Sequence, residues 1–292
     1  MIGIFDSGVG GLSVYREVRK ALPEASVYYF GDTAWCPYGP RERGFIIERA
    51  EAITEMLIKE ADIIVIACNT ATAAAISHLR ARYSDSANPQ VRERVLKLTG
   101  GRRDHIRFIG MEPAIKPAVA ITKTGTVGVL ATESTLNAEK YNQMKDLYKG
   151  DVTIIEQVGE GFVELVEKWD LSSQKAEVTV RKSISPLLNA GADTIVLGCT
   201  HYPFLLDTMR KIAGPQISFI DPAPAVARHL VYVLVQDRLL DEHSATQVLA
   251  RLVSGDVPGH EKNTGLPSKP DVTLLSSGDP EPLRRIFDKI FG

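Results

Sequence analysis

Short runs of apolar residues alternate with longer amphipathic segments along most of the chain. The short runs are continuous and rich in Val and Ile, as in "IIVIA" at 63–67, and do not alternate with polar residues. Strands of this kind are typical of a parallel sheet that helices cover on both faces. The pattern therefore predicts an α/β fold, in which right-handed crossovers join successive parallel strands.

The expected elements follow from these two patterns. Strands are expected at 2–5, 26–30, 62–67, 106–110, 126–131, 152–156, 193–197, 217–220 and 271–275. Helices are expected at 10–21, 41–60, 70–83, 113–122, 135–148, 161–168, 174–190, 203–213, 222–240, 244–253 and 280–291.

A weak internal repeat divides the chain into two parts. The stretches "DIIVIACNTATAAAI" (62–76) and "DTIVLGCTHYPFLL" (193–206) share an Asp, an apolar strand, a Cys, a nearby Thr and a helix. The stretches "IGIFDSGVGGL" (2–12) and "VGVLATESTLN" (127–137) both end a strand in short polar side chains. We therefore expect two similar parallel-sheet α/β domains that face each other across a cleft. Ligands of open α/β sheets bind outside the carboxyl ends of the strands, where both thiols lie.

Length and composition limit the classes of function. The chain has 292 residues, enough for two ordinary domains, and its net charge of −2 provides no global field for nucleic acid or a membrane. No apolar run reaches 18 residues, and the N-terminus leads directly into a strand without signal-peptide features. We therefore expect a cytoplasmic protein with neither a nucleic-acid nor a membrane partner.

The segment 84–107 interrupts the alternation of strands and helices. Between Arg80 and Arg107 there are eight Arg or Lys residues and three Asp or Glu residues. A basic patch for an acidic partner is one interpretation. A solvated linker helix and loop is favoured, because no aromatic side chains are interspersed for base stacking.

The chain has three cysteines, at 36, 68 and 199. This odd number indicates a reducing compartment, and their spacing matches no metal site, so no metal is expected. Cys68 and Cys199 each follow a strand and precede a helix, whose N-terminus is expected to lower the thiol pKa. Two thiols across a cleft suit removal of a proton from carbon on one face and its return on the other. The alternative is that all three are packed residues, which we favour for Cys36.

The stretch "FDSGVGGLS" (5–13) imitates a dinucleotide-binding fingerprint, with Asp32 at the end of the next strand. The third glycine is absent, however, and Asp6 would repel a pyrophosphate. A glycine turn that permits close packing is favoured, with Asp6 and Ser7 facing the cleft. In the loop "FGDTAWCPYGPRER" (30–43), Tyr38 and Gly39 could offer backbone N–H groups to a carboxylate.

Three ionisable residues are candidates to assist the thiols. His201 lies two residues after Cys199 and could hold its thiolate or transfer its proton. Asp6 could do the same for Cys68. Glu167 lies in "FVELVEKW", where a solvated helix face is the favoured interpretation.

Several motifs together resemble the glutamate racemase family, whose members act without a cofactor and supply D-glutamate for peptidoglycan. These motifs span nearly the whole chain: "FDSGVGGL", "YFGDTAWCPYG", "ACNTATAAA", "GMEPAIKPA", "VGVLATEST", "GCTHYPFL" and "SSGDPEPLRRIF". The resemblance implies a homodimer, and two domains at 1–98 plus 209–292 and at 99–208. It implies that Cys68 takes the proton from D-glutamate and Cys199 from L-glutamate, with Asp6, His201 and Glu167 as auxiliaries. The implied substrate-binding residues are Asp6, Ser7, Pro37, Tyr38, Gly39, Asn69, Thr70, Thr132, Thr135, Thr200 and His201.

Three other functions remain open from the sequence. One is an aspartate racemase or another amino-acid racemase, against which the resemblance speaks because those enzymes usually have Glu at the position of His201. The second is a dinucleotide-binding oxidoreductase. The third is a ligand-binding module without catalytic activity, in which the cysteines are only packed.

Overall fold

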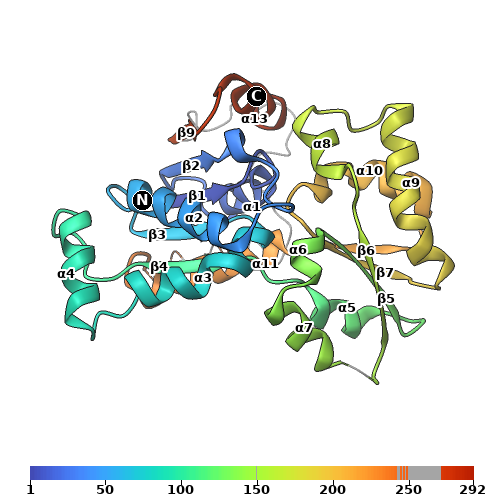
Figure 1. The fold of residues 1–292 in the computed structure, drawn as a ribbon, viewed down its shortest axis with the longest axis horizontal. Helices are drawn as coiled ribbons and strands as arrows, with labels where there is room; N and C mark the ends of the chain where they lie inside the picture. The colour runs from blue at the N-terminus through green and yellow to red at the C-terminus, as the bar shows by residue number, and fades with distance from the viewer. Residues whose placement is uncertain (149, 242–243, 245, 247, 249–270) are drawn as a thin grey trace.

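The computed structural model describes residues 1–148, 150–241, 244, 246, 248 and 271–292. Within these residues the strands form two separate sheets, in which every pairing is parallel (Figure 1). The strands are Ile2–Asp6 (β1), Val27–Gly31 (β2), Ile63–Ile66 (β3), Arg107–Gly110 (β4), Thr126–Ala131 (β5), Thr153–Val158 (β6), Thr194–Gly198 (β7), Ser218–Ile220 (β8) and Val272–Ser276 (β9). Each expected strand is confirmed to within two residues.

The two sheets share one topology. The first has the order β4-β3-β1-β2-β9, and the second, written in the same sense, has the order β8-β7-β5-β6. The strands β1 to β4 thus correspond one to one with β5 to β8, and β9 extends the first sheet. The expectation of two similar α/β domains is confirmed. We call the first sheet and its helices the first half, and the second sheet and its helices the second half.

The chain passes between the sheets later than the sequence analysis expected. The strand β4 belongs to the first sheet and β8 to the second, so the passages follow Gly110 and Ile220. The expected boundaries at 98/99 and 208/209 do not coincide with these points. The segment 84–107 has the composition of a linker, yet it leads into an edge strand of the sheet that precedes it.

The helices cover both faces of each sheet. They are Leu12–Ala21 (α1), Arg43–Leu57 (α2), Asn69–Tyr83 (α3), Pro89–Leu98 (α4), Ile115–Ile121 (α5), Glu133–Leu136 (α6), Glu139–Asp146 (α7), Phe162–Glu167 (α8), Gln174–Asn189 (α9), Leu206–Ala213 (α10), Ala223–Gln236 (α11) and Glu281–Phe291 (α13), with 3₁₀ turns at Thr33–Trp35 (η1) and Tyr202–Leu205 (η2). The helix expected at 135–148 is two helices, because Ala138 is extended. The helix expected at 203–213 begins as η2, and the helix expected at 244–253 lies mostly outside the described residues.

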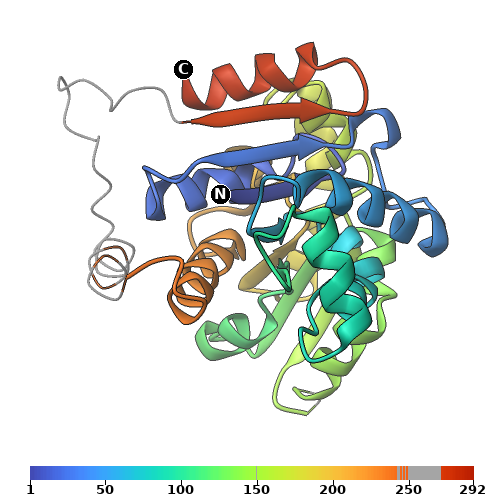
Figure 2. The same ribbon diagram turned by 90° about the vertical axis from the view of Figure 1, so that its left-hand side faces the viewer.

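Burial explains why the central strands form a rigid base for the loops that follow them. Every residue of β1, β3 and β7 is buried. The helices α1 and α11 pack together, as do α2 and α3, and α13 lies alongside β9 at the edge of the first sheet (Figure 2). Each fully buried Val or Ile contributes about 1.5–3 kcal/mol relative to an exposed one. The loops after these strands are therefore held in place by the cores beneath them.

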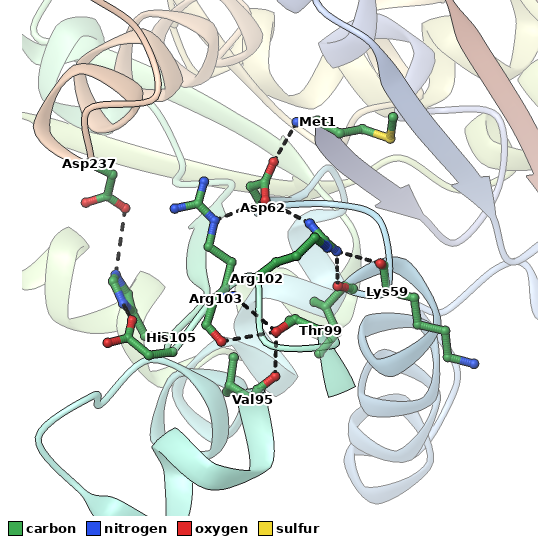
Figure 3. A network of polar contacts seen from close by, with 11 residues as sticks. Met1, Lys59, Asp62, Val95, Thr99, Arg102, Arg103, His105 and Asp237 are labelled. Atoms are coloured by element: carbon green, nitrogen blue, oxygen red, sulfur yellow. Dashed lines mark hydrogen bonds and ion pairs between the residues drawn. The ribbon is translucent and has the colours of Figure 1, made fainter. Parts of the chain in front are cut away.

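The basic segment 84–107 forms a solvated helix and loop, as expected. Asn88 caps α4 by accepting the backbone N–H of the second and third residues after it. After this helix, Arg102 and Arg103 each donate to Asp62 Oδ1 at 3.0 Å, and the Met1 ammonium donates to Asp62 Oδ2 at 2.7 Å (Figure 3). Arg102 and Arg103 thus form ion pairs within the first half.

None of the described helices is long and apolar enough to span a membrane.

Candidate active site

A cavity of about 270 Å³ lies between the two halves, where the carboxyl ends of both sheets face each other. Its walls are the loops after β1, β2 and β3 from the first half and after β5, β6 and β7 from the second. In the first sheet the strand order reverses between β1 and β3, and in the second sheet it reverses between β5 and β7. Open α/β sheets bind ligands at such points, and the loops after these four strands all line the cavity. The predicted site residues that line it are Ser7, Pro37, Tyr38, Gly39, Cys68, Asn69, Thr70, Thr132, Cys199, Thr200 and His201.

Three predicted site residues lie behind this lining. Asp6 and Glu167 contact it through hydrogen bonds, and Thr135 contacts Thr132 with 2.9 Å between their Oγ1 atoms. The lining residues that sequence analysis missed are Pro40, Glu133, Val158, Gly159, Glu160, Gly161, Val163, Glu164 and Tyr202. Six of these nine lie between 158 and 164, in the end of β6, the connection "GEG" and the start of α8. The glycine pair after the strand was the available signal.

Cys68 is the N-cap residue of α3, and its Sγ accepts the backbone N–H of Ala71 at 3.4 Å. The thiol also lies 3.9 Å from Ser7 Oγ. Burial, and next the charge of Asp6, raise the pKa of Cys68 far above its usual value. The Ala71 N–H at the helix N-terminus lowers this pKa, as expected, but burial and Asp6 outweigh that contact, so the predicted net fall is wrong. A negative charge on Cys199 raises the pKa of Cys68 further, so two thiolates do not coexist easily.

Cys199 lies at the end of β7 beside a buried histidine. Its Sγ is 3.8 Å from His201 Nδ1, and His201 Nε2 is 2.6 Å from Glu167 Oε1. Burial alone would lower the pKa of His201, but Cys199, Cys36 and Glu167 together raise it well above its usual value. This shift favours the imidazolium, which can donate to a thiolate on one side and to the carboxylate on the other.

Glu167 is held by three donors and is not a residue of a solvated helix face. Its Oε1 accepts the Val9 N–H at 2.9 Å and the Cys36 thiol at 3.4 Å, in addition to His201. Burial alone would raise the pKa of Glu167, but the contacts with His201, Val9 and Cys36 outweigh it and lower the pKa. The carboxylate therefore stays ionised. Because the contact at Val9 comes from the first half, Glu167 also joins the two halves.

The glycine-rich turn after β1 permits this close packing between the halves. A Cβ at Gly8 would lie 2.0 Å from Glu167 Oε1, and a Cβ at Gly10 would lie 2.2 Å from His201 Nδ1. No side chain fits at either position without displacing Glu167 or His201. The preference for a glycine turn over a nucleotide loop agrees with this geometry. Gly11, the residue before α1, lies close to Asp6 at the end of β1, whereas Gly8 and Gly10 approach the other half.

Asp6 is fully buried at the end of β1. Its Oδ2 accepts the N–H groups of Gly8 and Gly11 at 3.0 and 3.1 Å, and Thr200 Oγ1 lies 3.4 Å from Oδ1. Burial raises the pKa of Asp6, while His201 and the two N–H groups lower it less strongly. Among the described residues no hydrogen bond links Asp6 to Cys68. Its effect on that thiol acts through its charge.

Asn69 has the property expected of a residue that binds a ligand. It is 5% exposed and lines the cavity, yet its Oδ1 and Nδ2 have no hydrogen-bond partner in the described structure. A buried amide without partners costs about 1–3 kcal/mol. Next to it, Thr70 Oγ1 is 3.1 Å from Thr132 Oγ1, which joins the halves across the cavity. A polar ligand in the cavity would satisfy the Asn69 amide.

Asp32 has a structural role. Arg49 donates to both of its carboxylate oxygens, at 2.9 and 2.6 Å, and the Tyr38 hydroxyl also donates to it. Asp32 is fully buried, so this carboxylate is not free to bind a ribose. The network fixes the loop that brings Tyr38 and Gly39 to the cavity. Because Asp32 is engaged in this way, it does not serve as the ribose-binding acidic residue that a dinucleotide-binding site requires.

Comparison with known proteins places the chain among racemases. The Asp/Glu/Hydantoin racemase family model matches residues 107–230. The glutamate racemase of Herpetosiphon aurantiacus is 43% identical over 260 residues, which cover 89% of this chain and 94% of that protein. A glutamate racemase isoform from Bacillus anthracis has a TM-score of 0.74 at 25% identity, covering 100% of this chain and 94% of that one. The Escherichia coli glutamate racemase was solved with L-glutamate and the activator UDP-MurNAc-Ala. It has a TM-score of 0.72 at 26% identity, and the match covers 99% of this chain and 94% of that one.

The relatives match this chain over nearly its whole length, and the solved structures share the arrangement of two parallel-sheet α/β domains found here. This chain belongs to the glutamate racemase family.

Proposed function

We propose that this protein interconverts L- and D-glutamate without a cofactor, using Cys68 and Cys199 as its two proton carriers. The observation that supports this most is the placement of the two thiols. Cys68 follows β3 and Cys199 follows β7, the corresponding strands of the two sheets, and both thiols line one cavity between the halves. Inversion of a carbon centre requires a base on one face and an acid on the other, which two such thiols supply.

The two directions of reaction use the thiols in opposite roles. With L-glutamate, the Cys199 thiolate takes the α-proton and the Cys68 thiol gives its proton to the other face of the carbanion. With D-glutamate the roles are exchanged. The direction assigned to each thiol rests on the resemblance to the family. The raised pKa of Cys68 keeps it protonated in the resting site, which suits its role as acid toward the carbanion formed from L-glutamate.

The α-proton of an amino acid is very weakly acidic, so the site must stabilise the carbanion. Among the described residues that line the cavity there is no Lys or Arg, hence no lysine there for a pyridoxal Schiff base. The substrate's carboxylates would instead meet neutral donors: the Asn69 amide and the hydroxyls of Thr70, Thr200 and Ser7. Fixed donors of this kind, aimed at the charge that develops on the α-carboxylate, contribute most when water is excluded.

The auxiliary residues serve different thiols. The His201 imidazolium stabilises the Cys199 thiolate, and Glu167 holds the imidazole ring and its charge. Asp6 acts on Cys68 through its charge, and its own raised pKa would let it take up a proton when that thiol must become a thiolate for D-glutamate. As in the family, we propose a cytoplasmic homodimer that supplies D-glutamate for peptidoglycan.

The direct test is to incubate the purified protein with L-glutamate and no added cofactor, and to follow D-glutamate by chiral chromatography. We expect conversion to an equal mixture, unchanged after dialysis against a chelator, and a lower kcat/KM for L-aspartate. Cys68→Ser and Cys199→Ser should abolish racemisation, because a serine hydroxyl is too weakly acidic to form an adequate base. An absolute requirement for a metal or for pyridoxal phosphate would overturn the proposal.

A further inference from the structure

Three side chains that bind transition metals in other proteins meet at the boundary between the halves. The Cys36 sulfur, a Glu167 carboxylate oxygen and a His201 ring nitrogen all lie within 4.8 Å of one another. Cys36 follows η1 in the first half, whereas Glu167 ends α8 and His201 follows β7 in the second. Glu167 Oε1 is central, at 3.4 Å from Cys36 Sγ and 2.6 Å from His201 Nε2.

Two of the three separations can be compared with those of a tetrahedral zinc site, and the third, between Cys36 and His201, is within 4.8 Å. Zinc bonds of about 2.0–2.3 Å place neighbouring ligand atoms about 3.3–3.5 Å apart. The contact between Cys36 and Glu167 already has this length. The contact between His201 and Glu167 must open by about 0.7 Å, since a metal ion would replace the proton that now joins them. One thiolate, one imidazole and one carboxylate suit zinc and cobalt, and they suit magnesium poorly.

Two of the three donors belong to residues that are partly exposed. Cys36 is half-buried, and the Glu167 side chain is 23% exposed, while His201 is buried at 2%. The carboxylate and the thiol thus form the outer side of the cluster and the imidazole the inner side. Three protein ligands would leave a fourth position for water, as in zinc sites that are not closed.

We propose that Cys36, Glu167 and His201 form an inhibitory binding site for Zn²⁺ that bridges the two halves of the molecule. Binding forms three coordinate bonds, and the Cys36 thiol and the His201 imidazolium release their protons to solvent. One Zn²⁺ enters as two protons leave, so the net charge of the cluster stays the same. The ion holds the imidazole at Nε2 and must separate it from Glu167, which now lies 2.6 Å away, so the ring beside Cys199 is displaced. The ion also links the two walls of the cavity. Metal binding does not depend on the reaction, whereas the inhibition rests on the proposed racemase function.

Binding is tested on the full chain with Co²⁺ as a spectroscopic substitute for zinc. A thiolate ligand gives a near-ultraviolet charge-transfer band, which we expect to saturate at one ion per chain and to disappear when Zn²⁺ is added. Cys36→Ser and Cys36→Ala should lose this band while keeping the circular dichroism spectrum of the folded protein. Cys68→Ser and Cys199→Ser should keep the band. A band that survives in both folded Cys36 variants, or that requires Cys68 or Cys199, overturns the site.

Inhibition is tested separately by racemisation of L-glutamate at increasing Zn²⁺. We expect loss of activity, recovery on adding a chelator, and no effect of Mg²⁺ at the same concentrations. Removing a residue that only hydrogen-bonds to a metal ligand lowers metal affinity by about 10–100-fold. Loss of a direct ligand in Cys36→Ser should therefore raise the Zn²⁺ concentration needed for inhibition by about 100-fold or more. If the cobalt band depends on Cys36 but Zn²⁺ leaves the wild-type rate unchanged, the site binds metal and its inhibitory role is refuted. If the wild-type protein shows the band but racemises no glutamate, the proposed reaction fails and the metal site stands.

Discussion

Replacement of Glu167 by Gln tests how the second half supports its thiol. The change is nearly isosteric, and the new amide oxygen can still accept the N–H of Val9. It removes the negative charge 2.6 Å from His201 Nε2. A hydrogen bond to a charged group is worth about 1.5–3 kcal/mol, so the imidazolium beside Cys199 is destabilised by that amount. The corresponding loss in kcat/KM is about 10–150-fold.

The assay separates the two thiols. Because the two enantiomers have equal free energy, kcat/KM for racemisation must fall equally in both directions. A glutamate analogue with a leaving group at Cβ needs only the first deprotonation before it eliminates. In Glu167→Gln we expect elimination from the L-analogue, which uses Cys199, to fall about 10–150-fold. Elimination from the D-analogue, which uses Cys68, should change much less.

The pH dependence provides an independent readout. Glu167 raises the pKa of His201, so the protonated ring persists to higher pH in the wild-type protein. Without that charge the pKa of His201 falls. As the pH is raised, the variant should therefore lose the activity that needs the imidazolium at a lower pH than the wild-type protein does. Equal losses of elimination from both analogues, or an unchanged pH profile in a folded variant, would refute the role assigned to Glu167.

Three further variants test packing and electrostatics. Gly10→Ala should lower kcat/KM by about 100-fold, since its Cβ would lie 2.2 Å from His201 Nδ1 and displace the ring. Arg49→Met should lower the free energy of unfolding by about 3 kcal/mol in urea denaturation, because Asp32 would remain buried without its bidentate partner. Asp62→Asn should lower the free energy of unfolding by about 1 kcal/mol at neutral pH. Burial alone would raise the pKa of Asp62, but the N-terminal ammonium and Arg103 lower it. The advantage of Asp62 in thermal unfolding should therefore hold above about pH 4 and vanish as pH falls through the lowered pKa.

Matched controls separate these effects from general damage. Gly44 has nothing within 4 Å of an added Cβ, so Gly44→Ala should leave activity unchanged. Arg43 is exposed on the same helix as Arg49, and Arg43→Met should change stability by less than about 0.5 kcal/mol. Full activity in Gly10→Ala, equal effects at positions 43 and 49, or an Asp62 effect that does not shrink as the pH falls below about 4, would contradict the corresponding argument.

The fold was predictable because continuous Val and Ile runs determine a parallel sheet, and because the repeated Asp–strand–Cys stretches mark corresponding strands. The shared strand order of the two sheets confirms that interpretation. The points where the chain passes between the sheets were not predictable from composition. The short edge strands β4 and β8 have little apolar length, and only pairing with a neighbouring strand determines their sheet.

Within the site, sequence identified the residues that follow strands and missed what depends on three-dimensional proximity. Cys68, Asn69 and Cys199 are marked by their position at strand ends. The contact between Glu167 and His201 joins residues 34 apart, and nothing along α8 distinguishes that glutamate from a solvated one. The raised pKa of Cys68 depends on burial and on a carboxylate distant in sequence, and these outweigh the lowering effect of the local helix terminus.

The central claim is that two different thiols act on opposite faces of one carbon. The most direct measurement is racemisation of L-glutamate in D₂O, with deuterium at the α-carbon followed in each enantiomer during the first turnovers. If Cys199 removes the proton and Cys68 returns another from solvent, deuterium enters the D-enantiomer well before the remaining L-enantiomer. If deuterium enters both enantiomers equally from the start, one shared base is at work and the two-thiol account is contradicted.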